Sequence, residues 1–158
     1  MVLMPSRALL SNTTPQGASA YIEADFNYPE RIVAEAGDVL GFEQPLGILF
    51  LGVLGHAESY AELVRIAGTV MAAAPSGSYL VLWDGTADSA EYGTLCTNYA
   101  GTGGAPYIPR PRDQIRGVFD GLALVEPGFV SITQWRPCAD KAGLTRPISA
   151  YGAVVRKP

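Results

Sequence analysis

The sequence predicts an α/β fold that ends in an antiparallel pair of strands. Apolar runs suited to buried strands alternate with segments whose apolar residues recur at the helical period. The last two strand-like runs are separated only by a Pro-rich loop with no helix, which is typical of antiparallel neighbours. The chain has 158 residues, of which 48% are hydrophobic and 16% charged. This length and composition predict a single domain over residues 1–158 with its own core.

The first half of the chain predicts a helix over residues 2–10 and a strand over residues 18–24. Pro29 starts a second helix, whose apolar residues keep the helical period until Gly41. Residues 46–53 are apolar throughout apart from two glycines, which indicates a strand buried on both faces in a parallel sheet.

The second half begins with a helix whose apolar face covers residues 60–71 and which ends before Pro75. A strand over 78–83 follows, then a loose region from 86 to 109. A short helix before Gly121 precedes residues 122–125 and 129–135, which are predicted to form either a pair of strands or one bent strand. Residues 148–155 are predicted to form the last strand.

Charge and hydropathy exclude two classes of partner. The formal charge is −4, and no basic cluster is larger than the pair Arg110 and Arg112, so a nucleic-acid-binding protein is not expected. The longest apolar run, residues 46–55, is about half of the ~20 residues that cross a bilayer, and no membrane association is expected. No secretion signal opens the chain, which favours a soluble, cytoplasmic protein.

The chain lacks the residues for several common catalytic sites. Cys96 and Cys138 lie far apart with no second Cys or His beside them, so they are expected to be free thiols and no metal site is predicted. His56 is the only histidine, and no G-x-S-x-G motif is present, which argues against a serine hydrolase.

Ligands of open α/β sheets bind at the carboxyl ends of the strands. Three loops lie there in the predicted fold, at residues 25–27, 52–56 and 84–86. Gly52 and Gly55 leave room for a ligand to approach the backbone, and His56 is a candidate general base because imidazole titrates near neutral pH. The alternatives are a turn-forming role for Asp25 and a structural, hydrogen-bonded role for His56. Four tyrosines are candidates either for a substrate pocket or for packing: Tyr60, Tyr92, Tyr99 and Tyr107.

Four stretches resemble a known family. They are GILFLGVLGH at 47–56, PSGSYLVL at 75–82, FDGLALVEPG at 119–128 and YGAVVRKP at 151–158. Together they are similar to the bacterial S-adenosyl methyltransferase family, which has a Rossmann-like class I methyltransferase fold. The resemblance implies S-adenosyl-L-methionine as the cofactor and leaves the methyl acceptor open.

The family's seven strands have the order 3-2-1-4-5-7-6, with the last strand antiparallel. The resemblance makes the strands of this chain the third to the seventh, so the sheet is expected to be incomplete. The first strand with its glycine-rich loop and the second with its acidic end would be missing. The chain is thus expected to be the C-terminal portion of a methyltransferase, truncated, with weak or no activity alone.

The resemblance also implies the residues that contact the cofactor. Asp25 and Phe26 match the position beside the adenine ring, and Gly52, Val53 and Leu54 match a loop beneath the cofactor. Gly55 and His56 match a Gly-His variant of that loop. Pro111 departs from the pattern, because many members have a helix-capping Ser there.

Two other functions remain open at this point. The chain could be a noncatalytic remnant that serves as an interaction domain, or an α/β protein that binds another nucleotide. Without the first two strands, the apolar edge at 46–53 would be exposed. We therefore expect either self-association through this edge or its direct pairing with the strand at 18–24.

Overall fold

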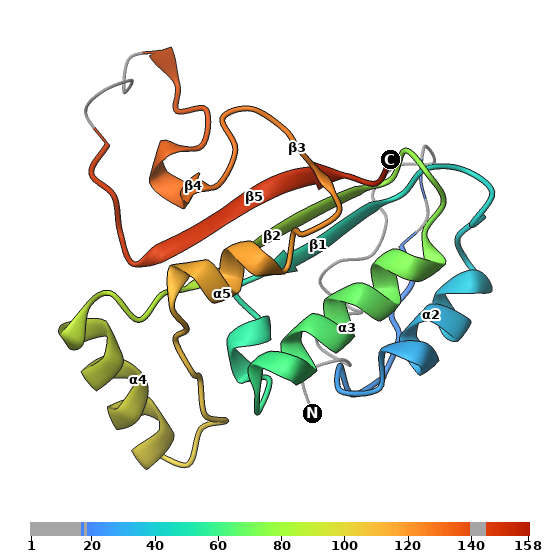
Figure 1. Ribbon diagram of the computed structural model, residues 1–158. Coiled ribbons are helices and arrows are strands. Elements are labelled where there is room, and N and C mark those ends of the chain that lie inside the picture. Colours follow the sequence, from blue (N-terminus) through green and yellow to red (C-terminus); the bar gives the residue numbers. More distant parts are fainter. Residues whose placement is uncertain (1–16, 18, 140–144) are drawn as a thin grey trace.

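Five strands form one sheet in the computed structural model, which describes residue 17, residues 19–139 and residues 145–158 (Figure 1). The strands are β1 (Gly47–Leu51), β2 (Tyr79–Gly85), β3 (Ala123–Leu124), β4 (Val130–Ser131) and β5 (Ala150–Arg156). Their order is β1-β2-β5-β3, and β4 also pairs with β5. β1 and β2 are parallel, whereas β5 is antiparallel to β2, β3 and β4. The predicted antiparallel C-terminal strands are therefore confirmed.

The helices in the described residues are α2 (Pro29–Gly37), α3 (Tyr60–Ala73), α4 (Ala90–Gly101) and α5 (Arg112–Gly117), with short 3₁₀ helices η1 (Leu54–His56) and η2 (Ile132–Gln134). The prediction for α3 is confirmed: Ser59 caps its first turn by accepting a hydrogen bond from the Glu62 N–H. α2, α3 and α5 lie on one side of the sheet (Figure 1). The helix expected at 2–10 lies outside the described residues.

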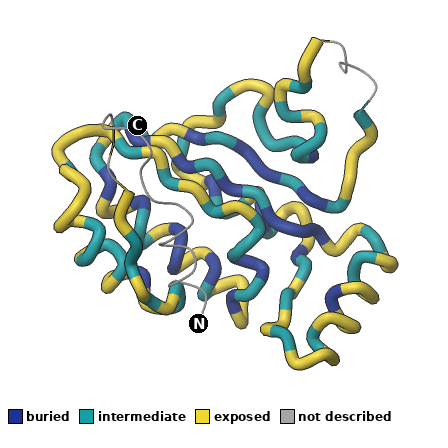
Figure 2. Tube along the Cα trace, turned by 180° about the vertical axis from the view of Figure 1, so that it is seen from behind, coloured by how far each residue is buried: buried dark blue, intermediate teal, exposed yellow. Residues whose placement is uncertain are grey.

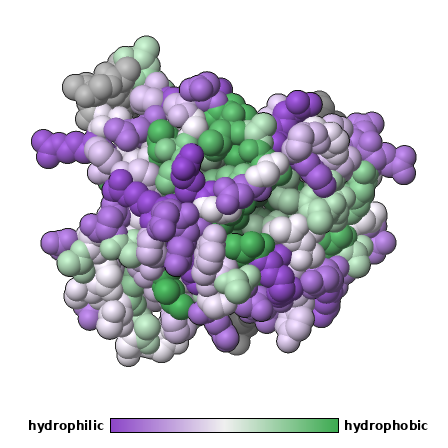
Figure 3. Space-filling model, in the orientation of Figure 1, coloured by the Kyte–Doolittle hydropathy of each residue, from purple (hydrophilic) through white to green (hydrophobic). Residues whose placement is uncertain are grey.

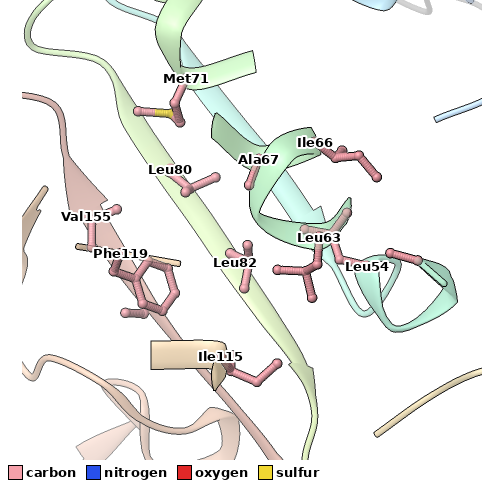
Figure 4. Close-up of a cluster of buried hydrophobic side chains, with 12 residues drawn as sticks. Leu54, Leu63, Ile66, Ala67, Met71, Leu80, Leu82, Ile115, Phe119 and Val155 are labelled. Atoms are coloured by element: carbon pink, nitrogen blue, oxygen red, sulfur yellow. The ribbon is translucent and has the colours of Figure 1, made fainter. Parts of the chain in front are cut away.

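The core lies between the sheet and the helices α3 and α5 (Figure 4). Alternate residues of β2 and β5 point into it, and a helical stripe of α3 faces them. Figure 2 shows this buried layer running through the middle of the molecule. The largest side chains in the cluster are Leu54, Leu63, Ile66, Met71, Leu80, Leu82, Ile115, Phe119 and Val155.

The prediction that residues 46–53 are buried on both faces is wrong. β1 alternates exposed and half-buried residues, and Leu49 and Leu51 keep 59% and 51% of their surface exposed. The helices in contact with the sheet lie on the opposite face, where Ile48 and Phe50 pack against the core. β1 is also an edge strand of the described sheet.

Three further expectations differ from the structure. Residues 19–24 form no strand, so β1 does not pair with them. The helix that begins at Pro29 ends at Gly37 rather than Gly41. The region 86–109 contains α4, whose first turn is capped by Ser89. α4 was missed because it has almost no apolar face: Cys96 is its single buried residue.

Pro111 occupies the N-cap of α5 and supplies no side-chain hydrogen bond, in agreement with its departure from the family pattern. Within the described part of the chain, no helix has the length and apolar character needed to cross a bilayer.

Candidate functional site

The carboxyl ends of the parallel strands β1 and β2 bring two of the three predicted loops together. The Gly52 N–H donates to the Trp83 carbonyl at 2.9 Å, and the Gly55 N–H donates to Asp84 Oδ1 at 3.1 Å. The loop at 52–56 therefore lies directly against the end of β2, in the position where open α/β sheets bind ligands.

Asp84 is the polar centre of this site. Its side chain is almost fully buried, with 1% of the residue exposed. Oδ1 accepts hydrogen bonds from the Gly55 N–H and the Tyr107 hydroxyl, whereas Oδ2 is buried with no hydrogen-bond partner among the described residues. Burial raises the pKa of this carboxyl, and the two hydrogen bonds to Oδ1 oppose that shift. A buried acid with a perturbed pKa and one oxygen without a partner among the described residues is a candidate for a functional group.

Tyr107 connects Asp84 to both loops. Its hydroxyl donates to Asp84 and accepts the Gly85 N–H at 2.8 Å. Burial, followed by the hydrogen bond to Asp84, raises the pKa of the phenol above its ordinary value, so Tyr107 stays neutral. A Cβ on Gly55 would clash with the Tyr107 ring, so this glycine is required by the packing of the tyrosine.

Arg110 also holds η1, and it was not predicted from the sequence as a site residue. Its buried guanidinium donates to the carbonyls of Leu54 at 3.3 Å and Ala57 at 2.6 Å. Burial lowers the pKa of this guanidinium, and the nearby charge of Asp84 opposes the shift. Tyr107 is one of the four tyrosines that the sequence offered as candidates, whereas no local pattern distinguishes Arg110 from loop residues.

His56 lies at the end of η1, beside the same network. Its Nδ1 is 2.8 Å from the Pro106 carbonyl oxygen, and its ring meets Tyr107 edge-on, with 5.1 Å between ring centroids and 89° between planes. The imidazole is half-exposed. His56 is therefore hydrogen-bonded, as the structural alternative expected, and remains accessible to a ligand.

The space beside the loop glycines is occupied by aromatic rings. Gly52 has a φ of +70°, and a Cβ there would approach the Trp83 ring to 2.5 Å. The side chain of Leu54 belongs to the core, and Val53 packs against the core from its edge. A ligand at this loop would consequently meet mainly backbone atoms and the His56 ring.

Asp25 and Phe26 lie in a separate turn before α2. Asp25 Oδ1 accepts the backbone and side-chain N–H groups of Asn27, each at 2.9 Å, which is the geometry of a turn former. Phe26 is half-buried and packs against the core cluster. The predicted residues thus fall into two groups, the turn at 25–26 and the loop at 52–56.

Asp25 lines an open pocket of about 570 Å³ between the N-terminal ends of α2 and α3. Glu58 and Glu62 line the pocket too, and Arg65 of α3 crosses it to pair with Glu30 of α2 at 3.0 Å. None of residues 52–56 is part of this lining. The pocket is polar and predominantly negative, which favours cations and hydrogen-bond donors. Searched over the described residues, no cluster of His, Cys, Asp and Glu could hold a metal ion.

Comparison with known proteins identifies relatives. The profile of the S-adenosyl methyltransferase family matches residues 1–158. The chain is 36% identical to a DUF574 family protein of known structure from Streptomyces avermitilis, with a TM-score of 0.88, covering 99% of this chain and 62% of that one. It is 25% identical to a protein from Thermobifida fusca assigned as a methyltransferase, with a TM-score of 0.79. That match covers 99% of this chain and 59% of the Thermobifida fusca chain. The chain thus spans about three fifths of each solved structure's length. No curated protein matches the chain.

Proposed function

Because the chain belongs to the S-adenosyl methyltransferase family, we propose that it takes part in methyl transfer from S-adenosyl-L-methionine to an acceptor. The observation that supports this most strongly is the loop at 52–56, which Asp84 ties to the carboxyl end of the neighbouring parallel strand. Family membership supports the general activity, and the geometry of this loop supports it as the proposed site.

The hydrogen-bond acceptors of the pocket at Asp25 suit the proposed cofactor. The carboxylates of Asp25, Glu58 and Glu62 offer acceptors for amine and hydroxyl donors such as those of an adenosine, and their negative charge suits a sulfonium cation. We propose that Asp25 and Phe26 contact the adenosine, and that the backbone around Val53 contributes from the loop. Gly52, Leu54 and Gly55 shape this loop, since their neighbours are Trp83, the core and Tyr107.

The contacts that we propose between this chain and the cofactor are few. Both polar groups of Gly55 already have partners, because its carbonyl accepts the Ile108 N–H at 2.7 Å and its N–H donates to Asp84. We therefore propose that the 158 residues by themselves bind the cofactor weakly and have little or no activity. His56 is the proposed base that takes the proton of the methyl acceptor.

Calorimetric titration with S-adenosyl-L-methionine tests this function. The chain should bind at least tenfold more weakly than the longer Streptomyces avermitilis relative. Asp25→Ala should weaken binding by about 1.5–3 kcal/mol, which is at least about tenfold, because a charge-assisted acceptor is removed. Asp38→Ala, which removes an exposed carboxylate at the other end of α2, is the control. His56→Ala should leave affinity nearly unchanged. Equal affinities of the chain and its longer relative would refute the weak-binding proposal.

A noncatalytic interaction domain is the second candidate, and the open face of the sheet favours it. Leu49, Leu51 and Trp83 lie on this face, where a 210 Å³ apolar pocket also includes Trp135. Figure 3 shows a hydrophobic area in the upper middle of the view, where Figure 1 draws β3 and β5. β1 carries no charged residue that would block edge pairing. We propose that self-association would occur through this edge.

A further inference from the structure

Three polar side chains from distant parts of the chain hold the turn that carries His56. Asp84 accepts the Gly55 N–H, Arg110 donates to carbonyls on both sides of Gly55, and Tyr107 covers it with its ring. Taking two charged groups out of water costs free energy that apolar packing would avoid. A network of this kind is better suited to orienting the turn than to stabilising it.

The contacts of His56 determine which ring nitrogen carries its hydrogen. The Pro106 carbonyl can only accept a hydrogen bond, so Nδ1, at 2.8 Å, must be the donor. In the neutral imidazole, Nε2 then keeps its lone pair. No hydrogen bond occupies Nε2 within the described part of the chain. The edge-on contact with Tyr107 restricts rotation of the ring.

The segment that supplies these contacts is itself anchored. Tyr107, next to Pro106, is tied to Asp84 and to the Gly85 N–H through its hydroxyl. Ile108 donates its N–H to the Gly55 carbonyl at 2.7 Å. The Pro106 carbonyl is therefore placed by a chain of hydrogen bonds that starts at the carboxyl end of β2.

We propose that Asp84 and Tyr107 are positioning residues that hold His56 as the Nδ1–H tautomer, and that the methyl acceptor is a neutral O–H or N–H nucleophile that hydrogen-bonds to Nε2. This inference rests on the proposed methyl transfer. The acceptor's lone pair forms the bond to the methyl carbon, the carbon–sulfur bond breaks with its electron pair remaining on sulfur, and the acceptor's proton passes to Nε2. An acceptor without an exchangeable hydrogen would have no use for this arrangement.

The single histidine makes the tautomer directly measurable. Protein labelled with ¹⁵N in the imidazole ring gives one pair of nitrogen signals, recorded at a pH where the ring is neutral. We expect Nδ1 to carry the hydrogen, which is the minor tautomer of a free histidine side chain. Tyr107→Phe keeps the ring contact and removes the hydroxyl, so the fraction of this tautomer should fall. Tyr79→Phe, at an exposed position of β2, is the matched control and should leave the signals unchanged.

Phenol and aniline serve as O–H and N–H probes of the acceptor, with anisole as the matched compound that lacks the exchangeable hydrogen. Phenol or aniline should shift the Nε2 signal, and anisole should not. An Nε2–H tautomer, or a Tyr107→Phe spectrum equal to that of the parent, would overturn the positioning role. Equal responses to all three probes, or none, would overturn the acceptor class. Calorimetry with S-adenosyl-L-methionine on the same samples reports separately on the proposed function.

Discussion

Lys157 provides the sharpest test of how the C-terminal end of α3 is stabilised. Its Nζ donates to the carbonyls of Met71 at 2.8 Å, Ala72 at 3.1 Å and Ala74 at 2.7 Å. α3 ends without a left-handed glycine cap, because Ala74 has an extended conformation. The ammonium therefore replaces the usual cap and places a positive charge at the negative end of the helix dipole.

Lys157→Met removes the charge and all three hydrogen bonds while retaining a long apolar stem. A buried charged hydrogen bond contributes about 1.5–3 kcal/mol, but these three share one half-exposed ammonium and water can reach the freed carbonyls. We expect the free energy of unfolding to fall by about 2 kcal/mol. For a chain of this length, that change lowers the melting temperature by roughly 4–8 °C.

Urea denaturation followed by circular dichroism measures the change. Arg156→Met is the matched control, because it removes a positive charge from the adjacent, exposed position of β5. Lys157→Met should shift the denaturation midpoint clearly more than the control does. Equal shifts would refute the capping argument and reduce the role of Lys157 to its charge alone.

Three further predictions concern packing, protonation and association. Gly55→Ala should destabilise the protein by about 1–3 kcal/mol, because the new Cβ clashes with the Tyr107 ring. Gly68→Ala places its Cβ in open space on α3 and should stabilise the protein by about 0.4–1 kcal/mol. The denaturation midpoints of the two variants measure both changes. The pKa of Asp84 is raised, so the Asp84 carboxyl binds a proton more tightly in the folded protein than in the unfolded chain. The free energy of unfolding should therefore fall as the pH rises from the ordinary pKa of an Asp through the raised pKa of Asp84 in the folded protein. Asp84→Asn should abolish this component, and a parallel pH dependence of both proteins would contradict the assignment. Light scattering after size-exclusion chromatography should detect self-association of the parent protein, and Leu49→Lys should weaken that self-association. A parent protein that is monomeric would contradict self-association through β1.

Local sequence patterns were sufficient to predict an element where the period of its apolar residues and its capping residues indicated the same structure. α3 shows this: its apolar residues follow the helical period, Ser59 provides the cap, and the predicted segment became the helix that covers the core. The glycines at the end of β1 and the acid at the end of β2 likewise marked the two loops that meet at the site. By contrast, α4 lacks an apolar stripe, and its period could not be read.

Residue order and composition alone were enough to predict the alternation of helices and strands and the antiparallel C-terminal strands, and to recognise the family resemblance. Tertiary structure alone decided that Leu49 and Leu51 are exposed, because an apolar strand has the same pattern whether one or both of its faces are covered. It also decided the partners of the turn that carries His56. Asp84, Tyr107 and Arg110 lie 28 to 54 positions further along the chain, and hydrogen bonds between such distant residues leave no local periodicity. Only folding, by joining the ends of β1 and β2, brings them to one turn.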